Sequence, residues 1–223
     1  MKVRLISYSQ PSEELLKEGI ENAQDLIAFC ARVSNPSNQY NTETSEKLIK
    51  YLIKNLHWSP LEMVSACLEI ETTRDIARQI LRHRSYAFQE FSQRYADPTK
   101  DLEFVIRDAR LQDPKNRQNS IALDDTIASE NLREQWKWHQ ENVIEQAKIA
   151  YQWAVLHGIA KEQARVVLPE GNTVSRLYLN GSIRSWIHYI SVRSDESTQL
   201  EHREIAIACA KAITKIFPMA ADL

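Results

Sequence analysis

Between Thr73 and Tyr95 the chain gathers residue types that are suited to binding an anionic ligand. The stretch reads TRDIARQILRHRSYAFQEFSQRY and contains five arginines but only two acidic residues, Asp75 and Glu90. The whole protein, by contrast, has a formal net charge of −2. The arginines are Arg74, Arg78, Arg82, Arg84 and Arg94. A guanidinium is a fixed, fork-shaped cation that matches carboxylate and phosphate geometry and stacks on aromatic faces. Aromatic residues lie among these donors, so the stretch suits a planar, anionic ligand.

The first part of this stretch has helical spacing. Arg74, Arg78 and Arg82 recur every four residues and would share one helix face, with Ile76 and Ile80 on the opposite side. A solvated surface helix with an apolar back would give the same pattern. A binding role is favoured because polar residues and aromatic side chains continue for eleven residues beyond the expected helix.

A second group of four arginines is opposed only by Glu170. These are Arg165, Arg176, Arg184 and Arg193. Ser182 is a good N-cap, and the N-terminus of the helix that it would start offers backbone N–H groups to a phosphate. If the two arginine groups face each other, they form an anion pocket. If they point apart, they are two basic surfaces, and spacing alone leaves both arrangements open.

Length and composition favour a single domain over residues 1–223 and a cytoplasmic protein. Hydrophobic content of 43% and charged content of 26% are ordinary for a globular protein, and the slightly acidic balance argues against a nucleic-acid partner. Cys30, Cys67 and Cys209 lie far apart in apolar runs, which is typical of buried thiols in a reducing compartment. No apolar run is long enough to cross a bilayer, and the N-terminus lacks a signal peptide, so no membrane association is expected.

Several common sites are missing from the sequence. The four glycines cannot build a GxGxxG or Walker A loop, and no HExxH or Cys/His cluster predicts a metal. No serine or cysteine has the context of a nucleophile. A pocket rich in arginine and aromatic residues, without nucleophile or metal, needs its chemistry from an organic cofactor.

Periodicity predicts the elements that position these residues. We expect strands at 3–8, 61–72, 103–106 and 173–179, and helices at 12–33, 45–56, 124–155, 182–193 and 198–217. Asn180-Gly181 is interpreted as a turn, and 96–120 as a probable loop insertion, with 107–120 exposed. The long helix at 124–155 would bury Trp136, Val143, Ala147, Ala150 and Ala154. The helix after Ser182 would bury Ile183, Trp186, Ile187 and Ile190.

The motifs resemble those of the flavin-dependent thymidylate synthases. Arg82-His83-Arg84, followed by Ser92 and Arg94, is similar to the family signature RHRxxSxNxxSxR. Further matching segments are His57-x-Ser59-Pro60-x-Glu62, Ala164-Arg165-x-x-Leu168-Pro169, Arg184-Ser185-x-x-His188 and Arg193-x-x-x-x-Thr198-Gln199. The departures are Ala87 for the first serine, Gln89 for asparagine, and His188 where Asn is frequent. None of these changes removes a charge.

The resemblance implies an α+β fold: one domain with a mixed or antiparallel sheet flanked by long helices. It also implies a homotetramer whose active sites, shared between subunits, hold FAD and dUMP. Methylenetetrahydrofolate would give the carbon to C5 of dUMP, and NADPH would reduce the flavin that supplies the hydride, so that dTMP is formed. The family uses no cysteine nucleophile, in agreement with the cysteine contexts.

Matching positions then imply residue roles. Contacts with dUMP are expected from Gln79, Ile80, Leu81, Arg82, Glu90, Phe91, Ser92, Gln93, Arg94, Arg165 and Arg193. Contacts with FAD are expected from Ser59, Arg82, His83, Arg84, Glu90, Ser182, Ile183, Arg184 and His188. Arg193 is the expected catalytic residue, because a fixed cation beside N3 of uracil would stabilise the N3 anion and make C5 more nucleophilic.

Two other functions stay open from the sequence. The arginine-rich segment could belong to a nucleic-acid or nucleotide-binding module, whose affinity would fall steeply with salt. The same pocket could also serve a flavoprotein with different reductive chemistry.

Overall fold

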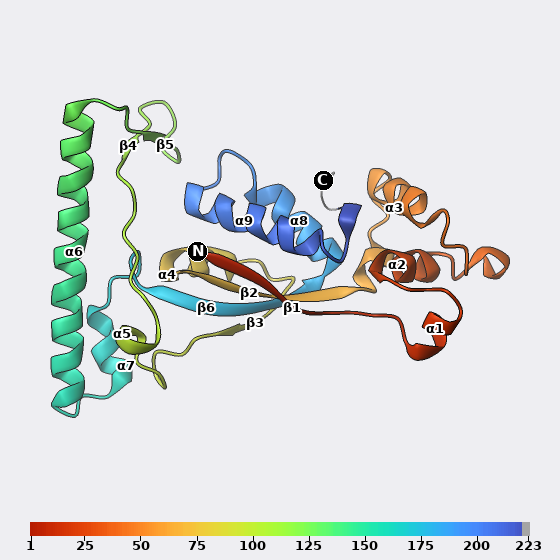
Figure 1. Ribbon diagram of the computed structural model, residues 1–223, viewed down its shortest axis with the longest axis horizontal. Coiled ribbons are helices and arrows are strands. Elements are labelled where there is room, and N and C mark those ends of the chain that lie inside the picture. The colour runs from red at the N-terminus through yellow and green to blue at the C-terminus, as the bar shows by residue number, and fades with distance from the viewer. Residues whose placement is uncertain (220–223) are drawn as a thin grey trace.

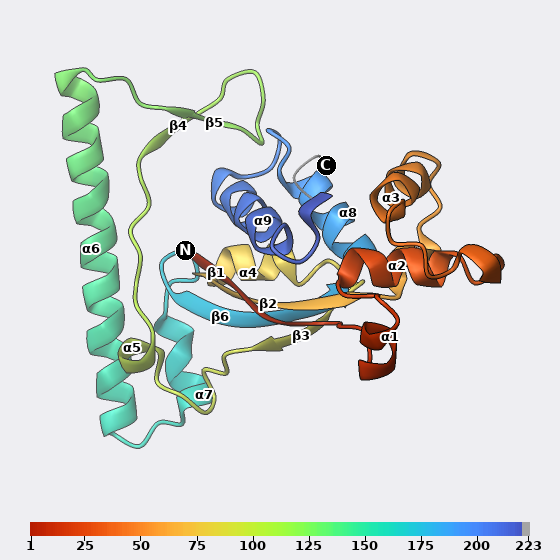
Figure 2. The same ribbon diagram turned by 45° about the vertical axis from the view of Figure 1, so that its right-hand side comes forward.

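A four-stranded antiparallel sheet forms the centre of the structure, a computed structural model that describes residues 1–219 (Figures 1 and 2). Its strand order is β1-β2-β6-β3, and every neighbouring pair is antiparallel. The strands are β1 (Lys2–Tyr8), β2 (Ser65–Thr73), β3 (Ala87–Glu90) and β6 (Val174–Ser182). A separate hairpin pairs β4 (Arg110–Gln112) with β5 (Ser120–Ala122). The sheet therefore confirms the expected α+β fold.

Side-chain alternation decides which face of the sheet is covered. In β2 the residues Ala66, Leu68 and Ile70 are fully buried, whereas the intervening side chains are only half-buried. Successive side chains of a strand point to opposite faces, so a period of two places one set in the core. Leu177 and Leu179 of β6 continue the same buried layer.

Helices cover this apolar face. They are α4 (Arg74–Ile80), α8 (Ile183–Arg193) and α9 (Leu200–Ile213), which lie over the sheet in both views (Figures 1 and 2). The indole Nε1 of Trp186 in α8 donates to the backbone oxygen of Ala66 at 3.0 Å. The predicted inner stripe of α8 is confirmed, because Ile183, Ile187 and Ile190 are buried with Trp186.

The remaining elements extend the molecule at both ends. One end holds α1 (Glu13–Lys17), α2 (Ala23–Ala31) and α3 (Ser45–Lys54), with the short 3-10 helices η1 (Pro36–Asn38) and η2 (Ser59–Glu62). The other end holds α5 (Pro98–Asp101), α7 (Lys161–Ala164), η3 (Arg165–Val167) and the 30-residue helix α6 (Ile127–Leu156). In Figure 1, α6 stands at the far end of the sheet from α2 and α3.

One predicted helix and one predicted strand have different bounds in the structure. The helix expected over 12–33 is interrupted, because Gly19 adopts a positive φ of 87° between α1 and α2. A left-handed residue ends a helix, and glycine adopts that conformation at least cost. The strand expected to begin at residue 61 is preceded by η2 and starts only at Ser65.

The turn predicted at Asn180-Gly181 is wrong, because both residues belong to β6 and pair with β2. A Cβ atom at Gly181 would lie 2.5 Å from the Tyr86 ring, so the missing side chain lets this ring pack against the strand. Tyr86 in turn packs edge-on against Trp186, with ring centroids 4.8 Å apart. The glycine serves a close approach rather than a reversal of the chain.

The region between β3 and α6 is more ordered than the loop that the sequence predicted. Residues 96–120 include α5, β4 and the first residue of β5, whereas the strand expected over 103–106 is reduced to one bridge between Phe104 and Thr173. In α6, Ala147 and Ala154 are buried as expected, but Trp136 and Val143 are 45% and 52% exposed. The helix instead buries Gln140, Ile144 and Tyr151.

Among residues 1–219, no helix combines the length and the apolar character needed to cross a membrane.

Candidate active site

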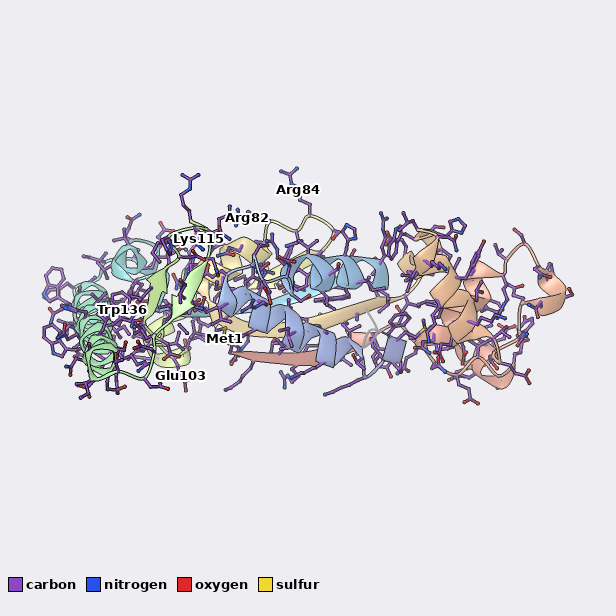
Figure 3. All side chains as sticks on the ribbon, turned by 90° about the horizontal axis from the view of Figure 1, so that it is seen from above. Met1, Arg82, Arg84, Glu103, Lys115 and Trp136 are labelled. Atoms are coloured by element: carbon purple, nitrogen blue, oxygen red, sulfur yellow. The ribbon has the colours of Figure 1, made fainter. Side chains whose placement is uncertain are left out.

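The RHR segment lies just beyond the C-terminal end of α4. This helix ends at Ile80, so Arg82 does not share a helical face with Arg74 and Arg78 as the spacing predicted. Arg82 and Arg84 are exposed, and both project from the same edge of the molecule (Figure 3). His83 lies between them in the sequence but turns inward and is half-buried.

His83 contacts Arg193, the residue predicted to be catalytic. The Arg193 Nε donates to His83 Nε2 at 2.9 Å, although the two residues are 110 positions apart. Burial, followed by the positive charges of Arg193 and Arg82, lowers the pKa of His83 to about 4. The imidazole is therefore neutral near pH 7 and accepts from the guanidinium, which fixes the end of the Arg193 side chain.

A second histidine lies behind this pair. His202 is fully buried, and its ring nitrogens lie 3.2 Å from Gln79 Oε1 and 3.2 Å from the Tyr189 hydroxyl. Burial, with Arg193 as the next cause, lowers its pKa to about 3. Tyr189 also packs edge-on against His83, with ring centroids 5.0 Å apart, and burial raises the pKa of its phenol. The network thus joins Gln79 to the His83 side of the site without a net charge.

Gln79 connects this buried network to the start of α9. Its Nε2 donates to Gln199 Oε1 at 2.8 Å, and the Gln199 Nε2 donates to Glu201 Oε2 at 2.9 Å. The other oxygen of Glu201 accepts from Arg110 of β4. A chain of side chains therefore runs from the β4–β5 hairpin to Tyr189 in the core.

Glu90, at the end of β3, lies within an arginine cluster. Its carboxylate is 3.7 Å from Arg74 and 3.3 Å from Arg78, and Ser175 donates to it at 2.8 Å. Arg74 also lies 3.5 Å from Glu170 and has only 12% of its side chain exposed. Arg74, on the helix face for which the sequence favoured a binding role, is thus a largely buried partner of Glu90.

The segment after β3 reaches α7. Arg94 Nε lies 3.2 Å from Glu162, and Lys161 donates to the backbone oxygen of Tyr95 at 2.9 Å. Arg165 follows α7 directly and is half-buried. Within residues 1–219 its guanidinium has no recorded ion pair or side-chain hydrogen bond. The structure therefore brings the Glu90–Arg94 segment and the Arg165 region to the same end of β3.

A third group of expected site residues surrounds the N-terminus of α8. Arg184 donates to Glu62 of η2 at 2.7 Å, and hydrogen bonds from Ser182 and Arg184 hold the pKa of Glu62 below its usual range. Ser182 caps α8 by accepting from the Ser185 N–H at 3.3 Å. The Ile183 N–H already donates to the Val64 oxygen, so fewer N–H groups are free for a phosphate than the sequence suggested.

Aromatic surface lies beside this group. Trp58 packs edge-on against His188, with ring centroids 6.4 Å apart, and Ser59 follows Trp58 at the start of η2. His188 is exposed on α8. Hydroxyl, imidazole and guanidinium groups therefore meet an indole at this corner.

Not every expected residue presents its side chain. Ile80 and Ile183 are fully buried in the core, and Gln93 is 3% exposed with its Nε2 unpaired within the described chain. Leu81, Phe91 and Ser92 are half-buried. Arg176 of the second arginine group lies apart, paired with Glu71 at 2.5 Å on the opposite face of the sheet. The second group of arginines therefore does not converge as a whole.

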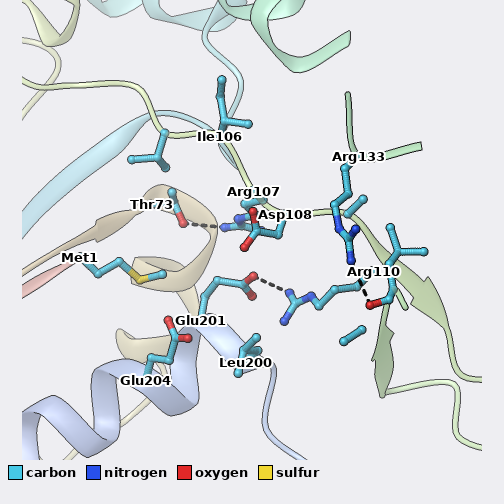
Figure 4. A pocket seen from close by; sticks show the side chains of 14 residues that line it. Met1, Thr73, Ile106, Arg107, Asp108, Arg110, Arg133, Leu200, Glu201 and Glu204 are labelled. Atoms are coloured by element: carbon cyan, nitrogen blue, oxygen red, sulfur yellow. Dashed lines mark hydrogen bonds and ion pairs between the residues drawn. The ribbon is translucent and has the colours of Figure 1, made fainter. Parts of the chain in front are cut away.

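The cavity in Figure 4 is separate from these residues. Its volume is about 440 Å³, and it lies between α9 and the segment that leads to β4. Arg107 donates to Thr73 and Asp75 there, both at 2.6 Å. Glu201 and Arg110 also line it, but none of the residues expected to bind a ligand does.

The sequence missed the residues that support Gln79 and His83. Tyr189, Glu201 and His202 lie on helices whose periodicity indicates only a buried face. Gln199 was part of a matching motif but received no role. The one available signal was His202, a polar residue shortly before the apolar run of α9.

The cysteines offer no nucleophile. Cys209 is buried, and Cys30 and Cys67 are half-buried rather than fully buried as predicted. Burial raises the pKa of all three thiols, which disfavours the reactive thiolate.

Comparison with solved structures supports the fold. A UMP/dUMP methylase, PolB from Streptomyces cacaoi, solved with 5-Br dUMP, superposes with a TM-score of 0.76. The match covers 99% of this chain and 93% of that chain at 24% identity, a level that establishes the fold alone.

Sequence comparison establishes the family. The chain is 51% identical to the flavin-dependent thymidylate synthase of a Synechocystis species over 99% of this chain and 98% of that protein. It is 45% identical to the probable flavin-dependent thymidylate synthase of Paramecium bursaria Chlorella virus 1, over 98% and 96% of the two chains. The family model described as "Thymidylate synthase complementing protein" matches residues 14–219. The resemblance drawn from the motifs is confirmed: the chain belongs to the family of the flavin-dependent thymidylate synthases.

Proposed function

We propose that this protein converts dUMP to dTMP, with 5,10-methylenetetrahydrofolate as carbon donor, FAD as bound cofactor and NADPH as reductant. The observation that carries this function is the contact between Arg193 and His83, because it joins two of the matching motifs across 110 positions. When bound and reduced, FAD supplies the hydride. The residues of this chain bind and orient the ligands and stabilise charge.

Arg193 acts on the uracil ring in this proposal. Its Nε is held by the neutral His83, so the two terminal nitrogens remain to face the N3 position. A cation there stabilises the N3 anion, and electron density rises at C5, where the new carbon bond forms. Because a guanidinium does not lose its own proton near pH 7, the field is constant during the reaction.

Arg82, Arg94 and Arg165 bind the phosphate end of dUMP. Arg82 is exposed, and within residues 1–219 neither it nor Arg165 is neutralised by a carboxylate. Arg94 has an exposed partner, Glu162, that a phosphate can replace. Glu90 is held by Arg74, Arg78 and Ser175, so its carboxylate is fixed at the edge of the same segment. Gln79, Ile80, Leu81, Phe91, Ser92 and Gln93 complete the nucleotide site through side-chain or backbone contacts.

The residues around the N-terminus of α8 fit FAD. Arg84 and Arg184 are exposed cations for its diphosphate, and Ser59 and Ser182 add hydroxyls. His188 and the neighbouring Trp58 offer ring surface for a flat heterocycle. His83 and Ile183 connect this corner to the core, and Arg82 and Glu90 lie between the flavin and nucleotide parts. Arg184 would exchange part of its contact with Glu62 for the ligand.

The protein acts as a homotetramer with active sites shared between subunits. The support is the exposure of most charged site residues and of large apolar side chains on α6. Ile127, Trp138, Trp153 and Leu156 are 84%, 59%, 56% and 83% exposed. A helix that exposes several large apolar side chains is suited to an interface between subunits. The reaction is placed in the cytoplasm, where free thiols such as Cys209 persist.

Tritium release from dUMP labelled at C5 tests the function. The purified protein, yellow with bound flavin, should release tritium only when NADPH and methylenetetrahydrofolate are both present. Flavin-loaded protein that releases none would refute the function and favour a flavoprotein with other reductive chemistry. Size-exclusion chromatography with light scattering tests the assembly, and an active monomer would contradict shared sites.

A further inference from the structure

The hydrogen-bond chain behind Gln79 has a direction. Glu201 marks one end, because a carboxylate accepts hydrogen bonds and donates none. Its Oε2 accepts from the Gln199 Nε2, so the oxygen of the Gln199 amide must face Gln79. That oxygen accepts from the Gln79 Nε2 at 2.8 Å. The orientation of both amides therefore follows from the position of one carboxylate.

The direction continues through His202 to Tyr189. The Gln79 Oε1 can only accept, so the ring nitrogen 3.2 Å away, His202 Nδ1, carries the proton. A neutral imidazole has one donor, and the His202 Nε2 must accept from the Tyr189 hydroxyl. Tyr189, His202, Gln79 and Gln199 each donate toward Glu201.

Reversal of the Gln79 amide would be costly. It would place the Gln79 oxygen against the Gln199 oxygen, and turning the Gln199 amide would then place an oxygen against Glu201. Glu201 is held in turn by Arg110, and their side chains are only 11% and 17% exposed. Water therefore has little access to repair such a mismatch.

We propose that Glu201 is a positioning residue for the nucleotide site: through Gln199 it fixes which end of the Gln79 amide faces His202 and where the second Gln79 N–H points. This inference rests on the proposed function, in which Gln79 contacts dUMP. The direction of the remaining N–H makes Gln79 a donor to the nucleotide at that point. Because Arg110 pairs with Glu201, the β4–β5 hairpin is part of the same support. The hairpin acts on this hydrogen-bond series through Glu201.

The Glu201→Gln variant tests the proposal in the flavin-loaded protein. A glutamine of equal size can donate to Gln199, which permits the whole chain to reverse. We expect the Kd and KM for dUMP to rise about tenfold, the factor that about 1.4 kcal/mol of binding energy produces. The kcat should stay within about threefold, because uniform binding is lost rather than transition-state contacts. Calorimetry and tritium release give these values, and the flavin absorption spectrum should not change.

Glu204→Gln is the matched control. Glu204 lies on the same helix, is exposed and has no recorded side-chain partner within residues 1–219. The Glu204→Gln variant removes the same charge but leaves the hydrogen bonds from Tyr189 to Glu201 unchanged. Its affinity for dUMP should therefore equal that of the wild type. If Glu201→Gln does not fold, Gln199→Met decides: it cuts the link to Gln79 while the Arg110–Glu201 pair remains, and the same loss of affinity is expected.

The outcomes separate the two proposals. Unchanged dUMP affinity in Glu201→Gln, or in Gln199→Met where the first variant does not fold, overturns the positioning role. A change of kcat with unchanged dUMP affinity overturns it as well. Wild-type protein that binds no dUMP refutes the proposed function together with the inference, whereas binding without tritium release refutes the proposed chemistry alone.

Discussion

Two regions beside α4 hold polar side chains by opposite means. Around His83 and His202 the side chains Gln79, Tyr189 and the two imidazoles are neutral, Arg193 is a cation beside His83, and the direction of each hydrogen bond carries the specificity. Around Glu90 the partners are charged and lie nearer the surface, with Arg78 43% exposed. Burial explains the difference, since a charge removed from water needs compensation that a neutral donor–acceptor pair does not. The first region should respond to pH and to amide orientation, and the second to charge and salt.

The largest effect should come from Arg193→Ala, which removes the cation beside His83. We expect turnover to fall about 10²- to 10³-fold, as when one preorganised charge or donor is removed from an active site. Tritium release measures turnover, and the visible spectrum should show that FAD is retained. Full activity in this variant would reject the assigned role of Arg193.

In the charged region, Glu90→Gln should cost stability. Arg74 and Arg78 would lose the carboxylate that they share. The Glu90 side chain is 17% exposed, so the loss should lie between that of a buried and that of an exposed ion pair. The free energy of unfolding should fall by about 1–3 kcal/mol, measured by urea denaturation. Glu170→Gln is the control, because this carboxylate also faces Arg74 but is 55% exposed, and it should change stability by less than about 0.5 kcal/mol.

The histidine region should make stability depend on pH. Because the pKa values of His83 and His202 are lowered to about 4 and 3, the unfolded chain binds more protons below pH 6.5 than the folded chain does. Stability should be full above about pH 6.5 and should fall as the pH drops toward 4, by at most about 1.4 kcal/mol per pH unit for each histidine.

Thermal unfolding between pH 4 and 7 measures this slope, and His202→Gln should reduce it. The slope should persist in high salt, because burial is its first cause. A slope that disappears in salt would mean that the two regions do not differ as described.

The smallest effect should come from Glu162→Gln. The Arg94–Glu162 pair is exposed at both ends, 57% and 48%, so water screens the attraction. Stability should change by less than about 0.5 kcal/mol in thermal denaturation. A larger loss would show that the charged region is more rigid than its exposure indicates.

Much of the fold could be predicted because it is local. The period of the apolar residues in α8 placed Trp186 and Ile190 inward, and the long helix α6 was found within a few residues of its ends. The predictions that failed depended on neighbours. Asn180-Gly181 was predicted to be a turn because the packing of the Tyr86 ring against Gly181 is not visible in the sequence, and Trp136 was predicted to be buried although it is 45% exposed.

The sequence by itself determined the family, through motifs such as Arg82-His83-Arg84, and the residue types that a nucleotide and a flavin require. Only the tertiary structure decided which side chains meet. It paired His83 with Arg193, put His202 and Glu201 behind Gln79, and sent Arg176 to the other face of the sheet. The physical reason is that helical and strand periods fix the direction of a side chain relative to its own element, whereas partners about a hundred residues apart are set by how the elements pack.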